Sequence, residues 1–381
     1  MSVDTICFVS LSAYGYFVDN PEIAGGGAQR QFYLLSRALS DDYNVHVIVG
    51  DYGQPERVVH DGVTLHRAYK PDTEATVVDQ FQQLHRLAMT IRSVDAGVYI
   101  SRGNPRLAGV VWALVRLFGG QWLYHVASDG HIETPEEYVS GPLGRLYWTA
   151  ITHADAIVVQ TDRQNQVITR RYGQQSTVIP NGYPPAEEIA PQDDREFVLW
   201  IGRLEPDEKR PDLFVELAEQ LPETAFRMLG PWEAHDTYRR RLADRIESTP
   251  NLTYEGAVEP EAVYNYYDQA LACVNTSAIE GFPNTFLEAW RAETVVVSLA
   301  VDPGRFIDID ADWTGFADGS MDTLTQQVRE ITTDETLRKT VAQQCREQFE
   351  QRYSVEALAS KYRDLLALLG NGPSHHDNRL S

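Results

Sequence analysis

Short apolar runs alternate along this chain with longer segments in which apolar residues recur every three or four positions. The short runs are typical of buried strands, and the longer periodicity is typical of helices packed on one face. In the first half, strands are predicted at residues 6–11, 44–49, 63–66, 98–100, 121–126 and 156–160. Helices are predicted from near Ala28 and at 76–92, 107–117, 143–153 and 161–172. This alternation predicts a mostly parallel, doubly wound α/β sheet.

The same alternation restarts after residues 180–191, which are rich in proline and small residues and therefore predict a linker. Strands are expected at 197–201, 225–229, 252–254, 270–275 and 295–298, with helices at 211–221, 234–248, 261–267 and 284–292. A chain of 381 residues exceeds the size at which a single core stops growing. We therefore predict two Rossmann-like domains facing each other across a cleft, at 1–183 and 184–352, then a crossover helix at 353–370 and a polar tail at 371–381.

The formal net charge of −22 predicts a strongly acidic surface. Only four lysines occur, so arginine supplies nearly all of the positive charge. Such a surface repels nucleic acid and anionic lipid at long range, and we expect no nucleic-acid partner. It favours a halophilic protein, because screening within about 3 Å at 1 M salt makes self-repulsion tolerable. An ordinary acidic cytosolic protein is the alternative.

The three cysteines, Cys7, Cys273 and Cys345, show no paired spacing. Buried thiols in a reducing compartment are therefore expected instead of disulfides or metal ligands. No signal segment opens the sequence, and no stretch reaches the ~18 apolar residues that span a bilayer. We expect a cytoplasmic protein. The apolar helix near 107–118 leaves a peripheral contact with the inner face of the membrane open, but a helix buried on its own sheet explains the same pattern.

The most informative stretch runs from Ser277 to Trp290. It follows the buried strand at 270–275 and places Glu280 in a turn and Glu288 in the next helix. Ligands of open α/β sheets bind just beyond the carboxyl ends of the strands, and a carboxylate accepts hydrogen bonds from two hydroxyl groups at once. The pair could therefore hold a ligand rich in hydroxyls. Taken alone, a solvated loop acid and a helix acid explain it equally well.

A second candidate is the glycine turn at 25–27, which precedes the helix that starts near Ala28. Backbone N–H groups at such a helix start can approach an anion. The spacing is neither the Gly-x-Gly-x-x-Gly of dinucleotide folds nor a P-loop. A plain tight turn is the alternative.

Taken together and in order, these motifs resemble the family-four retaining glycosyltransferases of the GT-B fold. The resemblance covers almost the whole chain and rests on the glycine turn, the stretch Val178-Ile179-Pro180-Asn181-Gly182, Gly202-Arg203-Leu204 with Lys209, and residues 277–289. It implies a C-terminal helix that returns to the N-terminal domain. It also implies transfer of a hexose-type sugar from a UDP- or GDP-linked donor to an acceptor hydroxyl, with retention of configuration and without a metal or other cofactor. The acceptor would be a lipid-linked glycan, as in protein glycosylation, or a surface polysaccharide.

The resemblance also implies roles for single residues. Arg203 and Lys209 would stabilise the leaving diphosphate, because fixed positive charge there lowers the barrier. Glu280 would hold a hydroxyl of the donor sugar, and His125 would hydrogen-bond beside that sugar, with a packed core histidine as the alternative. Asp129 would steer the acceptor. The donor-binding candidates are Gly26, Gly27, Val258, Gly281, Phe282, Pro283, Asn284, Thr285 and, on the ribose, Glu288.

Two departures from the family pattern fall in loops near the nucleotide. Family members usually carry Gly-x-Pro where this chain has Glu293-Thr294-Val295, and Gly-x-Gly where it has Leu229-Gly230-Pro231-Trp232-Glu233. The base and the sugar therefore stay open. The acidic triplet Asp308, Asp310 and Asp312 is interpreted as a solvated loop and not as a metal site.

Other reaction classes remain as alternatives. They are a nucleotide-sugar epimerase or a phosphorolytic enzyme on the same fold, and a non-catalytic sugar-nucleotide binding module. A nicotinamide dehydrogenase is disfavoured because its glycine fingerprint does not occur.

Overall fold

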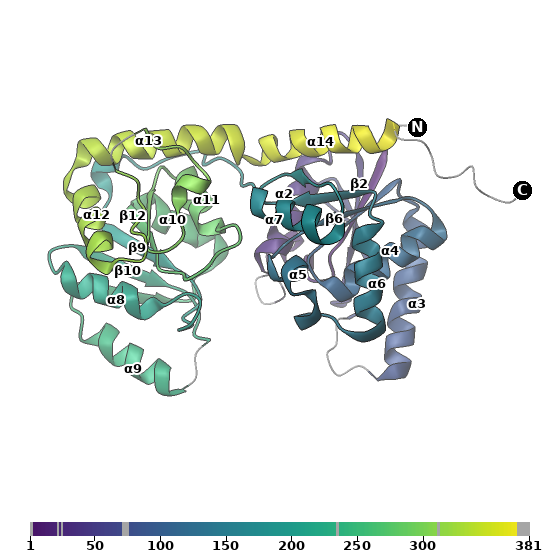
Figure 1. Ribbon diagram of the computed structural model, residues 1–381, viewed down its shortest axis with the longest axis horizontal. Helices are drawn as coiled ribbons and strands as arrows, with labels where there is room; N and C mark the ends of the chain where they lie inside the picture. Colours follow the sequence, from purple (N-terminus) through teal and green to yellow (C-terminus); the bar gives the residue numbers. More distant parts are fainter. Residues whose placement is uncertain are drawn as a thin grey trace, which may run out of the picture. The chain divides into compact units, whose positions relative to one another are not determined.

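The computed structural model describes residues 3–20, 23, 26–70, 76–233, 236–310 and 313–371. The chain forms two compact units, Met1–Gly182 together with Val355–Ser381, and Tyr183–Ser354. Each unit has its own parallel sheet, as the hydrophobic pattern predicts (Figure 1). We describe each unit by itself.

The first unit is built on an eight-stranded sheet in the order β3-β4-β2-β1-β5-β6-β7-β8. All neighbours pair in parallel except β3 and β4, which form an antiparallel edge pair. The prediction of a mostly parallel sheet is thus confirmed, whereas the two short strands at its edges, β3 and β8, were not predicted. The strands are β1 (Thr5–Val9), β2 (Asn44–Val49), β3 (Arg57–His60), β4 (Val63–Arg67), β5 (Val98–Arg102), β6 (Gln121–His125), β7 (Ala156–Val159) and β8 (Thr177–Val178).

Helices cover both faces of this sheet, and each face has its own buried cluster. Successive residues of a strand point to opposite faces, so Cys7 belongs to one cluster and Phe8 to the other. The helices are α1 (Tyr14–Phe17), α2 (Gly27–Ala38), α3 (Val77–Val94), α4 (Pro105–Phe118), α5 (Gly130–Glu133), α6 (Gly141–Thr152), α7 (Asp162–Val167) and α14 (Val355–Asn371), with the short helical turns η1 (Pro135–Glu137) and η2 (Ile168–Tyr172).

The last helix, α14, belongs to the first unit. Its residues Leu358, Tyr362 and Leu366 are buried in the same cluster as Phe8 of β1 and Phe32 of α2. The return of the C-terminal helix to the N-terminal unit, which the resemblance implies, is therefore present in the fold.

The apolar helix α4 packs inside the first unit. Val111, Leu114 and Val115 are buried in the cluster that also holds Tyr147 of α6. Internal packing therefore accounts for most of its apolar character, although Leu117 at its end is exposed. No helix that the structure describes is both long and apolar enough to cross a bilayer.

The second unit has five parallel strands in the order β11-β10-β9-β12-β13. They are β9 (Phe197–Ile201), β10 (Ala225–Leu229), β11 (Leu252–Gly256), β12 (Ala270–Asn275) and β13 (Val295–Ser298). Because all strands point the same way, the loops after β9, β10 and β12 meet at one edge of the sheet. The helices are α8 (Pro211–Gln220), α9 (Asp236–Glu247), α10 (Pro260–Gln269), α11 (Asn284–Arg291), α12 (Met321–Thr333) and α13 (Glu335–Arg352), with short turns η3 (Gln192–Asp194) and η4 (Pro303–Arg305).

The predicted linker is irregular but only partly exposed. Asn181 and Tyr183 are buried, and the Tyr183 N–H donates to the Tyr353 carbonyl at 3.0 Å. Tyr183 also bridges Ser354 in parallel. The chain therefore enters and leaves the second unit side by side.

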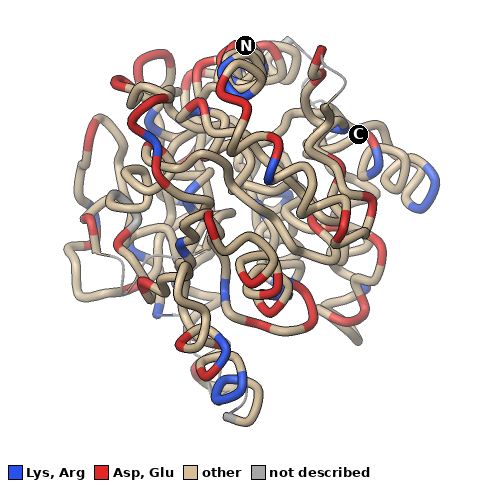
Figure 2. Tube along the Cα trace, turned by 90° about the vertical axis from the view of Figure 1, so that its left-hand side faces the viewer, with Lys and Arg blue, Asp and Glu red and all other residues tan. Residues whose placement is uncertain are grey.

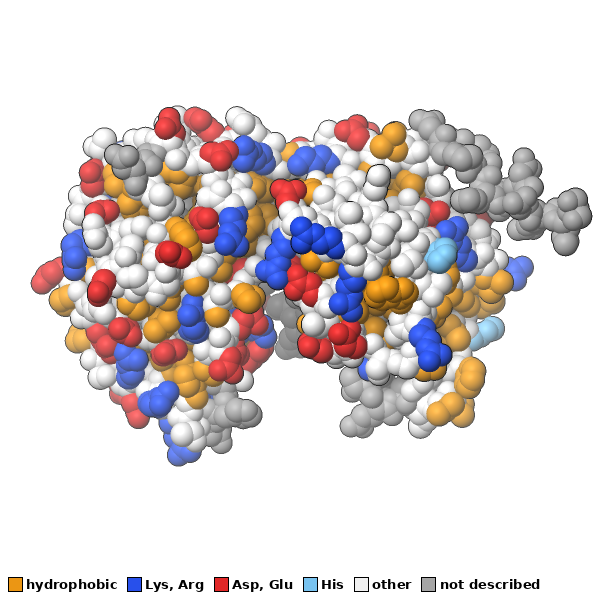
Figure 3. All heavy atoms as spheres, in the orientation of Figure 1, with side chains coloured by type: hydrophobic (Ala, Val, Ile, Leu, Met, Phe, Trp, Pro, Cys, Tyr) orange, Lys and Arg blue, Asp and Glu red, His pale blue; other side chains and the backbone are white. Residues whose placement is uncertain are grey.

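Acidic residues are spread over the surface and do not form one block. In Figure 2 they occur in helices and loops alike along the drawn face, and Figure 3 shows acidic, basic and apolar side chains interspersed. On the faces drawn, the negative charge is thus distributed among basic and apolar side chains.

The unusual Glu293-Thr294 pair ends α11 in a Schellman motif. The Glu293 N–H donates to the Trp290 carbonyl and the Thr294 N–H to the Ala289 carbonyl, at 3.1 and 2.9 Å. Glu293 has a φ of 53°, in the left-handed region where glycine is preferred. It therefore occupies the conformation for which the family's usual glycine is suited.

Buried polar contacts hold the next residue in place. The Thr294 hydroxyl accepts from Arg195 Nη1 at 2.7 Å and donates to the Tyr267 carbonyl at 2.6 Å. Arg195 is itself buried, and this burial lowers its pKa to about 10. Thr294 thus joins the start of β9 to the end of α10.

We expect Glu293→Gly to raise the free energy of unfolding by about 0.5–1 kcal/mol, because glycine adopts a positive φ without the Cβ clash. Urea denaturation at fixed salt measures the change. Glu293→Ala is the matched control, since alanine removes the carboxylate but keeps the strain. Equal gains in both variants would assign the effect to charge and contradict the backbone explanation.

Candidate active site

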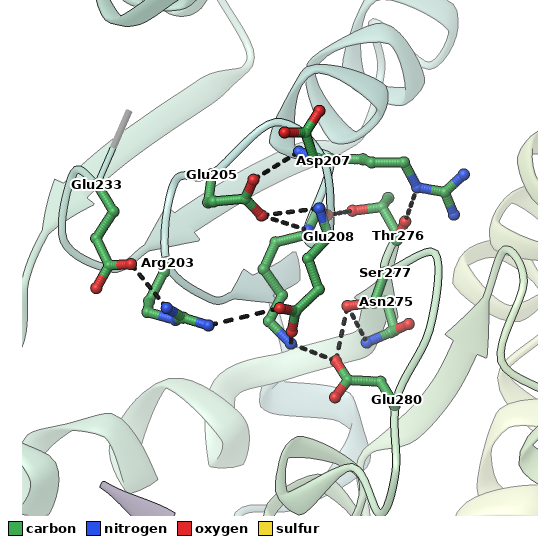
Figure 4. A network of polar contacts seen from close by, with 11 residues as sticks. Arg203, Glu205, Asp207, Glu208, Glu233, Asn275, Thr276, Ser277 and Glu280 are labelled. Carbon is green, nitrogen blue, oxygen red and sulfur yellow. Dashed lines mark hydrogen bonds and ion pairs between the residues drawn. The ribbon is translucent and has the colours of Figure 1, made fainter. Parts of the chain in front are cut away.

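Two loops of the second unit carry the predicted charged residues, and they follow neighbouring strands. Arg203 and Lys209 lie after β9, and Glu280 lies after β12, which pairs with β9. Figure 4 shows these loops together with the loop after β10. The structure therefore brings Arg203, Lys209 and Glu280 into one polar network.

Lys209 is the centre of this network. Its Nζ lies 2.6 Å from Glu280 Oε1 and 2.9 Å from Glu208 Oε1, and the side chain is 17% exposed. Burial alone would lower the pKa of the ammonium group, but the two carboxylates outweigh it, so the pKa is raised above its ordinary value. Lys209 therefore stays charged at any pH near neutrality.

The loop that carries Lys209 is shaped by Glu205. Its carboxylate accepts hydrogen bonds from the backbone N–H groups of Asp207, Glu208 and Lys209, at 2.7, 2.8 and 3.3 Å. Partial burial opposes ionisation, but the three N–H donors prevail and lower the pKa of Glu205. One charged carboxylate thus fixes the turn from which Lys209 projects.

Arg203 pairs with acids from two different loops. Its Nη1 lies 2.7 Å from Glu233 Oε2, and its Nη2 lies 3.7 Å from Glu208 Oε2. Almost half of the guanidinium side chain is exposed. Its charge is therefore both accessible and already paired.

Hydroxyl and amide groups position Glu280 from the other side. Ser277 Oγ donates to Glu280 Oε1 at 2.7 Å, and Asn275 Nδ2 donates to Ser277 Oγ at 3.3 Å. Oε1 thus meets both Ser277 and Lys209, whereas Oε2 has no hydrogen-bond partner within the described residues. One oxygen of Glu280 is therefore held by two neighbours, and the other keeps its capacity to accept a hydrogen bond.

The two loops are also tied by backbone contacts. Thr276 Oγ1 donates to the Lys209 carbonyl at 2.6 Å and accepts from Trp200 Nε1 at 2.9 Å. The Ala278 N–H donates to the Glu208 carbonyl at 2.8 Å. These contacts fix the relative positions of the Lys209 and Glu280 loops without relying on the charges.

Glu288 lies on α11, and its side chain is almost fully buried. Tyr267 Oη donates to Glu288 Oε2 at 3.2 Å. Burial and then the Glu288 charge raise the pKa of Tyr267 well above its ordinary value, so the phenol remains a donor. Because Thr294 binds the Tyr267 carbonyl, the Glu293-Thr294 departure supports the residue that holds Glu288.

The segment from Gly281 to Thr285 leads into α11. Pro283 is buried at the N-cap, and the Phe282 ring packs 5.1 Å from Phe306 and 5.7 Å from Tyr353. The first N–H groups of a helix have no intrahelical partner, so Asn284 and Thr285 begin α11 with donors directed out of its N-terminus. Val258 lies half-buried in the loop between β11 and α10.

The remaining candidates lie in the first unit. Gly26 is the N-cap of α2, and Gly27 is its first residue. A Cβ on Gly26 would meet only Gln29, at 3.9 Å, so packing within the unit does not require glycine there. Gly25 lies outside the described residues.

His125 ends β6 and is buried. Its Nδ1 lies 2.7 Å from the Tyr362 hydroxyl of α14, and its Nε2 has no hydrogen-bond partner among the described residues. Burial, and then the nearby Arg102 charge, lower the pKa of His125 well below its ordinary value. The imidazole is therefore neutral.

Asp129 precedes the short helix α5 and is engaged by α7. Gln164 Nε2 donates to Asp129 Oδ1 at 2.8 Å, and Arg163 Nε lies 3.8 Å from Oδ2. Gly26, Gly27, His125 and Asp129 thus belong to the first unit and the other candidates to the second.

The acidic triplet is occupied by local contacts where it is described. Asp308 pairs with Arg352 at 3.0 Å, and the Asp310 N–H donates to Gln344. Asp312 lies outside the described residues. Within the described part of the chain, no three His, Cys, Asp or Glu side chains are grouped as metal ligands.

Several supporting residues were not identified from the sequence. In the sequence alone, Glu205, Asp207 and Glu208 have the composition of an ordinary acidic surface loop. In the structure Glu205 and Glu208 are part of the same network. Tyr267, Tyr362 and Glu233 carried no sequence signal, because each contact joins segments far apart in the chain.

We expect Glu205→Gln to destabilise the loop, because an amide accepts the three N–H bonds more weakly than a carboxylate. Since the folded-state pKa is lowered, this stabilisation is complete above the ordinary pKa of about 4.5 and is lost as pH falls through the folded value. Urea denaturation of wild type and variant between pH 3 and 7 measures it. If the difference in unfolding free energy between wild type and variant grew toward acidic pH, this role of the Glu205 carboxylate would be contradicted.

We expect Tyr362→Phe to lower the free energy of unfolding by about 1–3 kcal/mol, because both nitrogens of the buried His125 would then lack partners. Chemical denaturation of the whole chain measures the loss. Tyr14→Phe is the control, since the Tyr14 ring stacks on Tyr52 and its hydroxyl has no partner in the described part of the chain. Equal losses of stability in both variants would mean that the hydrogen bond between Tyr362 and His125 does not account for the effect.

Comparisons with known proteins agree with this geometry. A family model for a glycosyl transferase 4-like domain matches residues 26–182, and the model for glycosyl transferases group 1 matches residues 186–348. No curated protein matches the sequence. The two family matches meet close to the boundary between the two units.

Solved structures share the fold at low sequence identity. Sucrose-phosphate synthase from Thermosynechococcus elongatus superposes with a TM-score of 0.72 at 22% identity, over 96% of this chain and 100% of that one. Anabaena HepE in complex with UDP and glucose gives 0.72 at 14%, over 96% and 100%. The lipopolysaccharide outer core galactosyltransferase WaaB gives 0.65 at 14%, over 96% and 99%. With two parallel Rossmann-like sheets and both family models matched, the chain belongs to the glycosyl transferases group 1 family and has the GT-B fold.

Proposed function

We propose that this glycosyltransferase moves a hexose from a UDP- or GDP-linked donor to an acceptor hydroxyl with retention of configuration. The observation that carries the proposal is the cluster of Arg203, Lys209 and Glu280 at the carboxyl ends of β9 and β12. The structures of Anabaena HepE with UDP and with UDP-glucose support a nucleotide-sugar donor.

The two cations would stabilise the leaving group. As the glycosidic bond breaks, negative charge develops on the diphosphate, and fixed positive groups lower the barrier to its departure. Arg203 can present a forked pair of donors to phosphate oxygens, and Lys209 supplies a point charge. The proposal therefore gives this role to side chains and needs no metal ion or other cofactor.

The two glutamates would hold hydroxyl groups of the donor. Glu280 is fixed through Oε1, and its Oε2 can accept from the sugar. Glu288 would accept from the ribose, with its position set by Tyr267. The backbone from Gly281 to Thr285 would line the sugar and diphosphate, and Val258 would meet the base.

Residues of the first unit would also contact the donor and the acceptor. Gly26 and Gly27 would let the N-terminus of α2 approach the diphosphate. The neutral His125 would use Nε2 for a hydrogen bond beside the donor sugar, because Nδ1 is taken by Tyr362. Asp129 would orient the acceptor hydroxyl.

The proposed acceptor is a lipid-linked or saccharide glycan. The product would serve protein glycosylation or belong to a surface polysaccharide. The support for this acceptor is the fold shared with WaaB, a lipopolysaccharide galactosyltransferase. Exposed apolar side chains of the first unit, among them Phe81 and Leu117, would allow a peripheral contact with the cytoplasmic face of a membrane. The acidic surface would suit work in concentrated salt.

The test begins with a thermal-shift screen of nucleotide-sugars, followed by assays of nucleoside diphosphate release with candidate acceptors. We expect Lys209→Ala and Glu288→Ala each to lower turnover by about 10²–10³-fold, because each loses a charged contact to the donor. Glu219→Gln is the control, since its ion pair with Arg245 joins α8 to α9.

Unchanged turnover in folded Lys209→Ala and Glu288→Ala would contradict the proposal. Donor binding without release under any acceptor would favour the binding module, and release that depends on inorganic phosphate would favour a phosphorolytic enzyme. Conversion of the donor sugar while it remains linked to the nucleotide would favour an epimerase. The anomeric configuration of the product, read by NMR, tests retention.

A further inference from the structure

The proposed diphosphate site is crowded with carboxylates. Its three cations, Arg203, Lys209 and Arg210, share the loops with five acids: Glu205, Asp207, Glu208, Glu233 and Glu280. Lys209 lies within 3 Å of two of these acids, and Arg203 lies 2.7 Å from a third. An incoming diphosphate would therefore meet Arg203 and Lys209 already paired with carboxylates.

The partner of Arg203 comes from the loop that replaces the family's usual Gly-x-Gly. Leu204 and Trp232 form a parallel bridge, and the Leu204 N–H donates to the Pro231 carbonyl at 2.8 Å. Neighbours of a bridged pair point to the face opposite that pair. Arg203 and Glu233 therefore project to the same side, with Nη1 and Oε2 in contact.

The close approach of these two loops is fixed by glycine. Gly230 has a φ of 140°, and a Cβ there would lie 1.7 Å from the Gly202 carbonyl oxygen. The Gly202 N–H donates to the Leu229 carbonyl at 3.1 Å. The Arg203–Glu233 contact thus follows from a backbone arrangement that admits no side chain at Gly230.

We propose that Glu233 is a built-in substitute for the donor's diphosphate, which holds Arg203 in the ligand-free protein and is displaced when the donor binds. This inference rests on the proposed function and adds a regulatory residue to the same site. A carboxylate and a phosphate use the same forked face of the guanidinium group. A phosphate on this face would compete with Glu233 for Nη1 and would bring a second anion against the same guanidinium charge, so donor binding becomes an exchange of one anion for another.

Glu233 is better suited to this exchange than Glu208. The Glu208 N–H is bound by Glu205, and its carbonyl accepts from Ala278, so its backbone is held on both sides. Glu208 also lies closer to Lys209 than to Arg203, at 2.9 against 3.7 Å. The Glu233 side chain is 44% exposed and pairs with Arg203 alone in the described structure. It can therefore turn into solvent without breaking another contact.

The exchange has a distinctive dependence on salt. An anion that binds a free cation loses affinity steeply as salt rises, because screening weakens the attraction. An anion that displaces a carboxylate forms one ion pair while another is broken. The net electrostatic gain is then small, so the affinity changes little with salt. Glu233 should therefore weaken donor binding most at low salt and least at high salt.

The experiment measures binding of UDP, and of GDP in parallel, to wild type and Glu233→Gln by calorimetry between 0.1 and 2 M KCl. We expect the variant to bind about five- to tenfold more tightly at 0.1 M and to differ by less than about twofold at 2 M. Glu219→Gln is the matched control, because Glu219 has the same 44% exposure and pairs with Arg245 at 2.8 Å. It lies near the end of α8, which runs back from the site.

A parallel salt dependence in wild type and Glu233→Gln, or weaker binding by the variant, would overturn the inference. The variant Arg203→Ala distinguishes a failure of the anion exchange from a failure of the proposed function. If wild type binds UDP or GDP, Arg203→Ala loses it, and Glu233→Gln has no effect, then the exchange is wrong and the proposed function stands. If neither nucleotide binds wild type at any salt, the proposed function fails and the inference falls with it.

Discussion

The position of the Lys209 ammonium between Glu280 and Glu208 is the interaction on which the candidate site depends. It joins the loops after β9 and β12, which are neighbours only because the sheet order places β12 beside β9. The ammonium is largely shielded from water, so its charge needs the two carboxylates. Glu205 on one side and Ser277 on the other then hold the partners in place.

The site combines rigid and exchangeable parts. The Thr276 hydroxyl accepts from Trp200 Nε1 and donates to the Lys209 carbonyl, which holds the two loops together. A hydrogen bond from the Tyr267 hydroxyl holds the Glu288 carboxylate. Arg203, by contrast, is half exposed and held mainly by one exposed acid. In the proposed function, the charge offered to the donor is thus carried by an exposed side chain, whereas Trp200, Thr276, Tyr267 and Glu288 are buried. This division agrees with catalysis by preorganised electrostatics.

Much of the fold follows from the hydrophobic pattern because many of the strands are buried on both faces. The expected strands at 197–201, 270–275 and 295–298 coincide with β9, β12 and β13. Strand β3 escaped prediction because an edge strand of four residues, Arg57–His60, has no continuous apolar run. Within the site, motif residues could be named from the sequence, but the contacts of Glu233 and Tyr362 could not. The contact of Glu233 depends on which loops meet, and Tyr362 lies 237 residues beyond His125 in the sequence.

The return of α14 to the first unit has a consequence for the order of folding. Phe8 of β1 shares its buried cluster with Leu358, Tyr362 and Leu366, so the core begun by the first strand is closed by the last helix. All residues of the second unit leave the ribosome before α14 does. Domains normally fold from the N-terminus onward, but here the inner segment can pack first, and the part of the N-terminal core that α14 covers stays open until α14 has been made.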